Sequence, residues 1–286
     1  MLLIRHIEPI SVIKLDPDGP IPSIPHSSDL WTIARTRDEL SLVCATRSTP
    51  LAGVLSHEDG WCAFRVAGIM EFTLTGIVAR ISDPIARAGL GIFVVSTFDT
   101  DYILIKAHDA PAAIEAWRKI GIDVTEPVIE TARLILVDLD EEVRQIASNS
   151  RDNRFWVEDY PTEGDVLIAR LELEVTESSQ ENPPSKFQIR LRSTGEAIGG
   201  IGFKADHNSD DLIGTEIGYG IAQSQQGKGF GTEAVAGILE LAHERGITTL
   251  LAETDPDNFA SQKVLLNNGF SEFTRSEQGI WWTRSL

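Results

Sequence analysis

A glycine-rich loop between a strand-like and a helix-like segment constrains this chain more than any other feature. Residues 213–222 are apolar, residues 232–245 have helical spacing, and the loop between them contains Gln226, Gly227, Lys228, Gly229, Phe230 and Gly231. Glycines let the backbone come close to a ligand, and the N-terminus of the following helix adds partial positive charge. With the hydroxyl of Thr232, the loop is a candidate cradle for a phosphate group.

Two familiar nucleotide-binding loops do not fit these residues. A Rossmann loop needs a third glycine, but the sequence after Gly231 is Thr232-Glu233-Ala234. A Walker loop carries its lysine at the end, whereas Lys228 precedes the last two glycines of this loop. A plain glycine-rich turn remains the alternative when the loop is considered alone.

The segments around the loop follow a definite order. Residues 215–222 are strand-like, with glycines of the kind that mark a bulge or the close approach of another backbone. Apolar residues then recur at helical spacing up to a stop at Gly246, and a strand is expected over residues 248–254. Asn258 and Ser261 follow in an N-x-x-S helix, before a Gly-Phe turn at residues 269–270.

Three strings in this order, EIGY, GKGFGTEA and NFAS…GF, resemble the GNAT acyl-CoA N-acyltransferases, and most closely the branch that acetylates ribosomal-protein N-termini. The resemblance covers the C-terminal half and implies acetyl-CoA as the cofactor. It places the pyrophosphate on the loop and the pantetheine arm along the strand before it. The cofactor-binding residues that it implies are Ile221, Ala222, Gln226, Gly227, Lys228, Gly229, Phe230, Gly231, Thr232 and Asn258.

Amine acetylation needs a neutral acceptor nitrogen, a stabilised oxyanion and a proton for the departing thiolate. Glu216 matches a position where GNAT enzymes often place a general base, and an amide near Ile221 or Ala222 is the candidate oxyanion donor. Ser261 matches a serine of the ribosomal branch, and both are predicted to be catalytic. The alternatives are a solvent-facing strand carboxylate and an ordinary first-turn serine. Many GNAT proteins carry a tyrosine where this chain has Leu265, so the general acid stays open.

The region between residues 131 and 203 is expected to supply the acceptor side of the site. Residues 131–137 resemble the first GNAT strand, followed by an acidic helix from Asp138 and a second helix over residues 162–175. A polar loop is expected at residues 176–185, and a hairpin over residues 187–192 and 197–203. Three aromatic residues are candidates for lining the acceptor pocket, with core packing as the alternative: Phe155, Trp156 and Tyr160.

The N-terminal half has a different pattern. Residues 78–88 and 110–119 have helical spacing, and residues 89–97 and 99–105 are expected to form a hairpin. This βαββα order predicts a ferredoxin-like α+β unit. Residues 72–105 resemble ACT domains of the aspartate-kinase and arginine-sensor type, and residues 2–44 resemble the first half of a tandem ACT arrangement. The expected fold is a tandem ACT-like (βαββαβ) domain, then a GNAT fold with a mixed, mostly antiparallel sheet flanked by helices.

ACT modules often bind amino acids beside the loop that enters their first helix. The resemblance therefore implies a ligand site formed by Thr73, Thr75, Gly76, Ser96, Thr97, Asp99 and Asp101. Hydroxyls and a helix N-terminus suit a carboxylate, and aspartates suit an ammonium group. The alternative is that these residues only cap elements and form the hairpin turn.

Charge and cysteine content narrow the classes of function. Of the net charge of −18, residues 1–128 contribute −5 and residues 129–286 contribute −13. A nucleic-acid binder would need a basic face, whereas the acidic C-terminal half suits a cationic amine, with a solvated surface as the alternative. No apolar run approaches a membrane span, and the opening apolar stretch is too short for a signal peptide. Cys44 and Cys62 lack metal-ligand spacing, so a cytoplasmic protein without a metal site is expected.

A connector near residues 125–131 predicts two domains, an ACT-like ligand-sensing domain over residues 1–128 and a GNAT acetyltransferase domain over residues 129–286. We expect an acetyl-CoA-dependent N-acetyltransferase that acts on a small-molecule or peptide amine and responds to an amino-acid effector. The alternative is a non-catalytic amino-acid sensor whose GNAT half only binds CoA or a partner. The acceptor and the oligomeric state stay open, and a homodimer is one outcome because ACT modules frequently pair.

Overall fold

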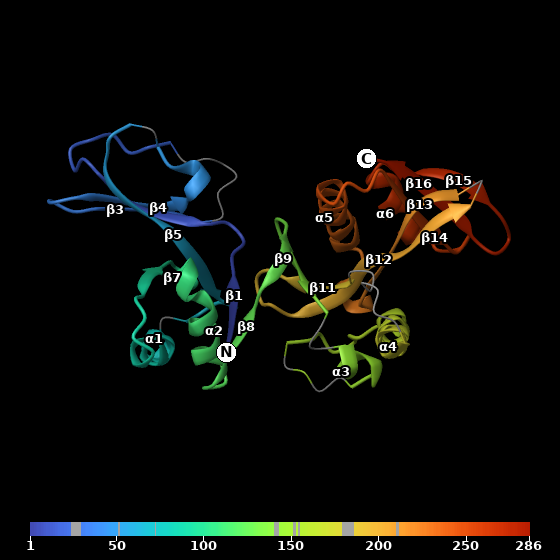
Figure 1. The fold of residues 1–286 in the computed structure, drawn as a ribbon, viewed down its shortest axis with the longest axis horizontal. Helices are drawn as coiled ribbons and strands as arrows, with labels where there is room; N and C mark the ends of the chain where they lie inside the picture. Colours follow the sequence, from blue (N-terminus) through green and yellow to red (C-terminus); the bar gives the residue numbers. More distant parts are fainter. Residues whose placement is uncertain are drawn as a thin grey trace. The chain divides into compact units, whose positions relative to one another are not determined.

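The computed structural model describes residues 1–286 except residues 24–29, 51, 72, 140–142, 151–152, 154, 179–185 and 210–211. The described chain forms two compact units, Met1–Glu126 and Pro127–Leu286 (Figure 1). Each unit has its own eight-stranded sheet and its own hydrophobic core. The expected division after residue 128 falls inside the first strand of the second unit, β9 (Pro127–Glu130).

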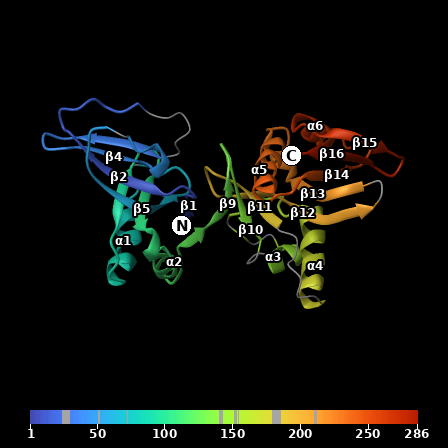
Figure 2. The same ribbon diagram turned by 45° about the horizontal axis from the view of Figure 1, so that its top comes forward.

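The N-terminal unit contains two α-helices and eight strands in its described residues. In chain order they are β1 (Leu2–Arg5), β2 (Ile10–Leu15), β3 (Trp31–Arg35), β4 (Leu40–Ala45), β5 (Val54–Val66), α1 (Ile77–Arg87), β6 (Phe93–Ser96), β7 (Asp101–Lys106), α2 (Ala110–Arg118) and β8 (Asp123–Thr125). Elements β5 to β8, with their two helices, have the βαββαβ order expected of an ACT unit. Figure 2 shows α1 and α2 on one side of these strands.

Both helices of this unit cover the sheet through one apolar core. Trp117 of α2 is fully buried and meets Phe64 of β5 edge to face, with 5.0 Å between the ring centroids. Its indole Nε1 donates to the carbonyl of Ile81 in α1, 2.9 Å away, so a single side chain joins the sheet to both helices. A buried indole usually has a hydrogen-bond partner, and here the middle of α1 provides it.

The first 45 residues differ from the expected tandem arrangement. Their described part forms strands, without an α-helix that would complete a second ferredoxin-like unit. β1 lies between β5 and β8, antiparallel to β5 and parallel to β8, whereas β2, β4 and β3 extend the sheet beside the first half of β5. The physical reason is length: these apolar runs have four to six residues, which suits strands and is too short for a helix that buries a stripe.

The C-terminal unit has a mixed, mostly antiparallel sheet. Its elements are β9, β10 (Leu134–Asp138), α3 (Val143–Ala147), α4 (Glu163–Ser178), β11 (Lys186–Leu191), β12 (Ala197–Ser209), β13 (Leu212–Ile221), α5 (Phe230–Glu244), β14 (Thr249–Thr254), α6 (Phe259–Asn267), β15 (Ser271–Arg275) and β16 (Ile280–Ser285). The sheet order is β15-β16-β14-β13-β12-β11-β10-β9, and only β13 and β14 run parallel. One face carries α5 and α6, and the other carries α3 and α4 (Figure 2).

Most helix and strand expectations for this unit agree with the structure, with shifted bounds. The strand expected over residues 131–137 is β10, which begins only at Leu134. Asp138, the expected start of a helix, still belongs to β10, and the described part of that helix is α3, Val143–Ala147. The hairpin strand expected to end at residue 203 continues to Ser209. Most of the expected polar loop at residues 176–185 lies outside the described residues. No helix in the described part of the chain is both long and apolar enough to cross a membrane.

Candidate functional site

Strands β13 and β14 separate and leave a cleft between them. β13 pairs with β12 along its whole length, but it pairs with β14 only at Thr215 and Glu216. Past this point lies a cleft of about 680 Å³. Residues that line it come from β13, from the end of β14, from α6 and from α4, and include Ile217, Gly218, Tyr219, Gly220, Thr254, Asn258, Ser261 and Asp165. The edge of β13 can therefore receive an extended ligand in place of a neighbouring strand.

The two amides expected to face this cleft lie on opposite edges of β13. The amide of Ala222 donates to the carbonyl of Ile198, 2.8 Å away, and so it faces β12. Because successive amides of a strand point to opposite sides, the amide of Ile221 is on the edge toward β14. Of the two candidate oxyanion donors, only Ile221 has an amide on the open edge. By the same alternation, the amide of Tyr219 is also on this edge.

The glycine-rich loop leads from β13 into α5 with a left-handed backbone. Gly227 and Gly229 have φ of 73° and 82°, a region in which a Cβ atom is strained. Gly229 is the N-cap of α5 and provides no side-chain cap. The first intrahelical bond runs from the amide of Glu233 to the carbonyl of Gly229, so the amides of residues 230–232 precede it. Their position at the helix N-terminus makes the loop an anion-binding geometry.

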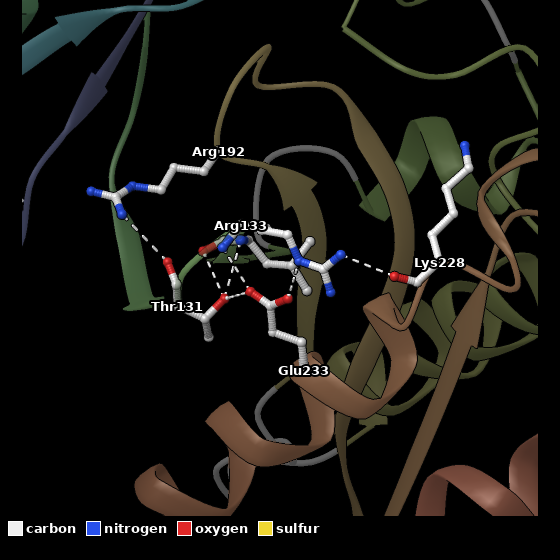
Figure 3. Close-up of polar contacts among 6 residues, drawn as sticks. Thr131, Arg133, Arg192, Lys228 and Glu233 are labelled. Carbon is white, nitrogen blue, oxygen red and sulfur yellow. Dashed lines mark hydrogen bonds and ion pairs between the residues drawn. The ribbon is translucent and has the colours of Figure 1, made fainter.

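Arg133, which directly precedes strand β10, binds this loop through its side chain (Figure 3). Nη1 of Arg133 donates to the carbonyl of Lys228 at 2.9 Å, and Nε donates to Oε2 of Glu233 at 2.7 Å. The other oxygen of Glu233 accepts from the amide of Arg133 and from Oγ1 of Thr131, at 2.7 and 2.6 Å. Burial alone would raise the pKa of the Glu233 carboxyl, but these hydrogen bonds outweigh it and lower that pKa. Arg133 thus joins the loop to the first turn of α5.

Glu216 lies where β13 and β14 separate, and the residue is only 8% exposed. It is therefore not the solvent-facing strand carboxylate considered as an alternative. Oε1 accepts from Nζ of Lys204 at 2.7 Å, and Oε2 is 3.0 Å from Nε2 of His207. The edge of the His207 ring meets Trp281, with centroids 5.3 Å apart. The carboxylate thus has two nitrogen partners, Lys204 and His207, both from β12.

Ser261 shares its hydroxyl with a tyrosine that the sequence reasoning did not single out as catalytic. The Tyr219 hydroxyl is 2.7 Å from Oγ of Ser261 and donates to its carbonyl at 3.0 Å. Oδ1 of Asn258 accepts from the amide of Ser261 and so caps α6. Burial raises the pKa of Tyr219 to about 12. Leu265, at the position of the expected tyrosine, is fully buried in the core.

The acceptor side of the cleft contains a second buried carboxyl. Asp165 lies in the first turn of α4 and accepts from the amide and from Oγ1 of Thr162, at 3.0 and 2.6 Å. Burial raises its pKa. Tyr160 lines a smaller adjoining cavity with Asp165, and its hydroxyl accepts from Gln188. Trp156 packs edge to face on Tyr160 in a core cluster, which agrees with the packing alternative for that residue.

In the N-terminal unit, a cavity of about 390 Å³ lies beside the start of α1. It brings together four of the seven expected ligand residues, Gly76, Ser96, Thr97 and Asp101, whereas Thr73, Thr75 and Asp99 are not among the residues that line it. Gly76 is the N-cap of α1 with φ of 79° and no side-chain cap. Asp101 is buried, and Oγ1 of Thr97 donates to the carbonyl of Thr100 at 2.7 Å. Three or more metal-ligating side chains do not gather anywhere in the described residues.

Comparison with known proteins assigns family models to both units. The acetyltransferase (GNAT) domain model matches residues 133–271, the ACT domain model matches residues 56–119, and a model described as an N-terminal domain matches residues 9–51. Over 99 residues the chain is 28% identical to the uncharacterized N-acetyltransferase p20 of Bacillus licheniformis. This match covers 34% of the chain and about half, 54%, of that relative.

Two solved structures are similar to parts of this chain. A crystal structure of a protein from Agrobacterium tumefaciens is 31% identical over 44% of this chain and 92% of its own, with a TM-score of 0.41. The ribosomal L7/L12 alpha-N-protein acetyltransferase RimL, solved in complex with coenzyme A, is 19% identical over 55% of this chain and 96% of its own, with a TM-score of 0.40.

Proposed function

We propose, from the premise that this chain joins an ACT domain to a GNAT acetyltransferase domain, that it transfers an acetyl group from acetyl-CoA to a primary amine. One observation carries the proposal: the open edge of β13 runs from the left-handed glycine loop at α5 to the buried carboxylate of Glu216. A pyrophosphate on the amides of residues 227–232 would direct an extended arm along this edge. Its acyl end would then lie at the point where β13 and β14 separate.

The groups at this point fit the steps of amine acetylation. Glu216 takes the proton of an acceptor ammonium, directly or through water, because its carboxylate is a buried hydrogen-bond acceptor behind Lys204, which lines the cleft. The acceptor nitrogen would take the place of the Lys204 ammonium on Oε1. The amide of Tyr219 or Ile221 on the open edge is the candidate to receive the oxyanion.

Return of a proton to the thiolate is assigned to the hydroxyl pair of Ser261 and Tyr219. Both side chains line the cleft and are 2.7 Å apart. Ser261 is the candidate catalytic donor, and Tyr219 positions it and can replace the proton that it gives. Asn258, at the same helix end, lines the cleft and is the candidate to hold the arm.

The direct test is consumption of acetyl-CoA in the presence of four classes of amine: protein N-terminal peptides, amino acids, polyamines and aminoglycoside antibiotics. We expect one class to accelerate thiol release well above hydrolysis, and the reaction product to carry the acetyl group on nitrogen. Calorimetry on the same protein measures acetyl-CoA binding independently. Absence of acetyl-CoA binding would refute the proposal.

A non-catalytic sensor remains the second candidate, favoured by Leu265 at the place of the usual tyrosine. In that case acetyl-CoA would bind without turnover in any amine class, and Ser261→Ala would leave its affinity unchanged.

We propose further that the cavity beside α1 binds an amino acid and that this changes acetyl transfer. The amides at the N-terminus of α1 suit the carboxylate, and the buried carboxylate of Asp101 suits the ammonium group. Thermal-shift screening of the full chain with each free amino acid identifies the ligand, and Asp101→Asn should abolish the shift. If the amino acid changes the affinity for acetyl-CoA by some factor, thermodynamic linkage requires that acetyl-CoA change the affinity for the amino acid by the same factor. If the ligand binds but turnover and acetyl-CoA affinity stay constant at saturation, the regulatory part of the proposal fails.

A further inference from the structure

Lys204 extends from β12 into the reaction end of the cleft. Its side chain crosses Gly218 of β13, where a Cβ atom would overlap Cε of the lysine. Its Nζ donates to Oε1 of Glu216 at 2.7 Å, and the lysine lines both the main cleft and the smaller cavity beside it. The cleft therefore holds a primary amine of the chain itself, on the carboxylate that the proposed reaction uses as its base.

The position of this amine coincides with the end of the proposed acyl path. An arm that follows the open edge of β13 from residue 221 toward residue 217 ends beside Gly218, which Lys204 covers. Because Gly218 has no side chain, Lys204 can lie directly against the backbone of β13. The side chain of Lys204 is 44% exposed, so it is accessible to a molecule that enters the cleft.

We propose that Lys204 is an acceptor of the acetyl group, so that the protein acetylates its own cleft. The inference rests on the proposed use of acetyl-CoA. The ammonium of Lys204 gives one proton to the carboxylate of Glu216, and the nitrogen lone pair attacks the thioester carbonyl carbon. A C–N bond forms, the C–S bond breaks, and the electron pair leaves on sulfur. The second proton of the nitrogen passes to the thiolate, so acetyl-CoA and the lysine ammonium yield acetyl-lysine, CoA thiol and one proton held by Glu216.

Binding of acetyl-CoA provides the physical reason for the first proton transfer. An ammonium–carboxylate pair is stabilised by the water around it, and a ligand that fills the cleft removes that water. Desolvation disfavours both charges, and the neutral amine–carboxylic acid pair then becomes accessible. The hydrogen bond at 2.7 Å already connects the two atoms that exchange the proton.

Acetylation would also change the cleft for other acceptors. The modified nitrogen no longer carries a charge, and Glu216 keeps only its contact with Nε2 of His207. The acetyl-lysine would occupy the place that an external amine needs. Modified protein should therefore acetylate external amines more slowly than unmodified protein.

The experiment is incubation of the full chain with acetyl-CoA, followed by peptide mass spectrometry at successive times. Lys186 is the internal control, because it lines the same cleft from the start of β11, whereas Lys204 donates to the carboxylate of Glu216 at 2.7 Å. We expect Lys204 to gain an acetyl group with a rate independent of protein concentration, ahead of Lys186. Glu216→Gln should slow the labelling of Lys204 by roughly 100-fold, as loss of a general base does, and leave the slow chemical labelling of Lys186 unchanged.

Calorimetric binding of acetyl-CoA separates the failures. If acetyl-CoA binds and external amines are acetylated while Lys204 stays unmodified, the inference is wrong and the proposed function survives. Equal labelling of Lys204 and Lys186, or undiminished labelling of Lys204 in a folded Glu216→Gln protein, would mean chemical acetylation and would also overturn it. If acetyl-CoA does not bind, the proposed function fails, and the inference with it.

Discussion

The two ends of the proposed site differ in composition. At the loop end, the groups offered to a ligand are backbone amides beside left-handed glycines, and Arg133 contacts the loop. At the reaction end, side chains lie in hydrogen-bonded groups: Glu216 with Lys204 and His207, and Tyr219 with Ser261. A backbone surface can hold an anion whatever reaction follows, whereas the side-chain pairs decide which proton moves. We therefore expect changes at the loop end to alter the affinity for acetyl-CoA, and changes at the reaction end to alter turnover.

The largest effect is expected from Glu216→Gln at the reaction end. Loss of the base should lower kcat by roughly 100-fold or more, with little change in acetyl-CoA affinity. Steady-state kinetics and calorimetry measure the two quantities. Asp206→Asn is the matched control, because Asp206 is an exposed carboxylate on β12 that accepts from Thr215 at 2.6 Å. A Glu216→Gln protein with wild-type kcat at neutral pH would show that turnover does not depend on this carboxylate.

Gly229→Val tests the loop end. A β-branched residue at φ of 82° costs on the order of 1–3 kcal/mol, and its Cβ would lie 3.4 Å from Nη2 of Arg133. We expect acetyl-CoA affinity to fall about 10- to 100-fold. Gly246→Val imposes a similar strain at φ of 73°, at the end of α5 and away from the cleft. It should lower thermal stability alone, and equal losses of affinity in both variants would show that strain, not the cradle, is responsible.

What the sequence reveals follows the same division. The loop is recognisable because its glycines, strand and helix are contiguous, and the GNAT and ACT resemblances are confirmed by the family models. Arg133 meets Glu233 across 100 positions, and Tyr219 meets Ser261 across 42, so no local spacing pairs them. Tyr219 lies in the EIGY string, but only the fold brings its hydroxyl to Oγ of Ser261.

The N-terminal unit repeats this lesson. The apolar spacing of the sequence predicts helices α1 and α2, because each is amphipathic and its apolar residues recur at the helical period. The insertion of β1 between β5 and β8 was not predicted. It depends on parallel pairing of residues 2–4 with residues 123–125, and such a long-range register leaves no mark in a short strand.

Arg133→Ala should have a moderate effect, confined to the loop end. The arginine is half exposed, and because water screens its charge, its ion pair with Glu233 contributes little to stability. Its hydrogen bonds, however, position the carbonyl of Lys228 and the carboxylate of Glu233. We expect acetyl-CoA affinity to fall several-fold, with kcat at saturation preserved. Arg192→Ala is the control, because Arg192 contacts the carbonyl of Thr131 at 3.5 Å, on the far side of the same network (Figure 3). A drop in kcat without a drop in affinity would reverse the assignment of the two ends.

Tyr219→Phe should have the smallest effect and can sharpen the comparison through pH. If Tyr219 only positions Ser261, the variant should lose a few-fold in kcat and nothing in acetyl-CoA affinity. Burial raises the pKa of this hydroxyl from 10 to about 12. An unfolded tyrosine therefore releases its proton between pH 10 and 12 while the folded one keeps it, so its contribution to stability is complete below pH 10 and declines as pH rises to 12. Denaturant unfolding of both proteins from pH 8 to pH 11 measures this: the advantage of the wild type over Tyr219→Phe should shrink above pH 10. If the stability difference between wild type and Tyr219→Phe stays constant or grows over that range, the fold does not hold the hydroxyl in its protonated state. Ser261 would then have to protonate the thiolate without a proton supplied by Tyr219.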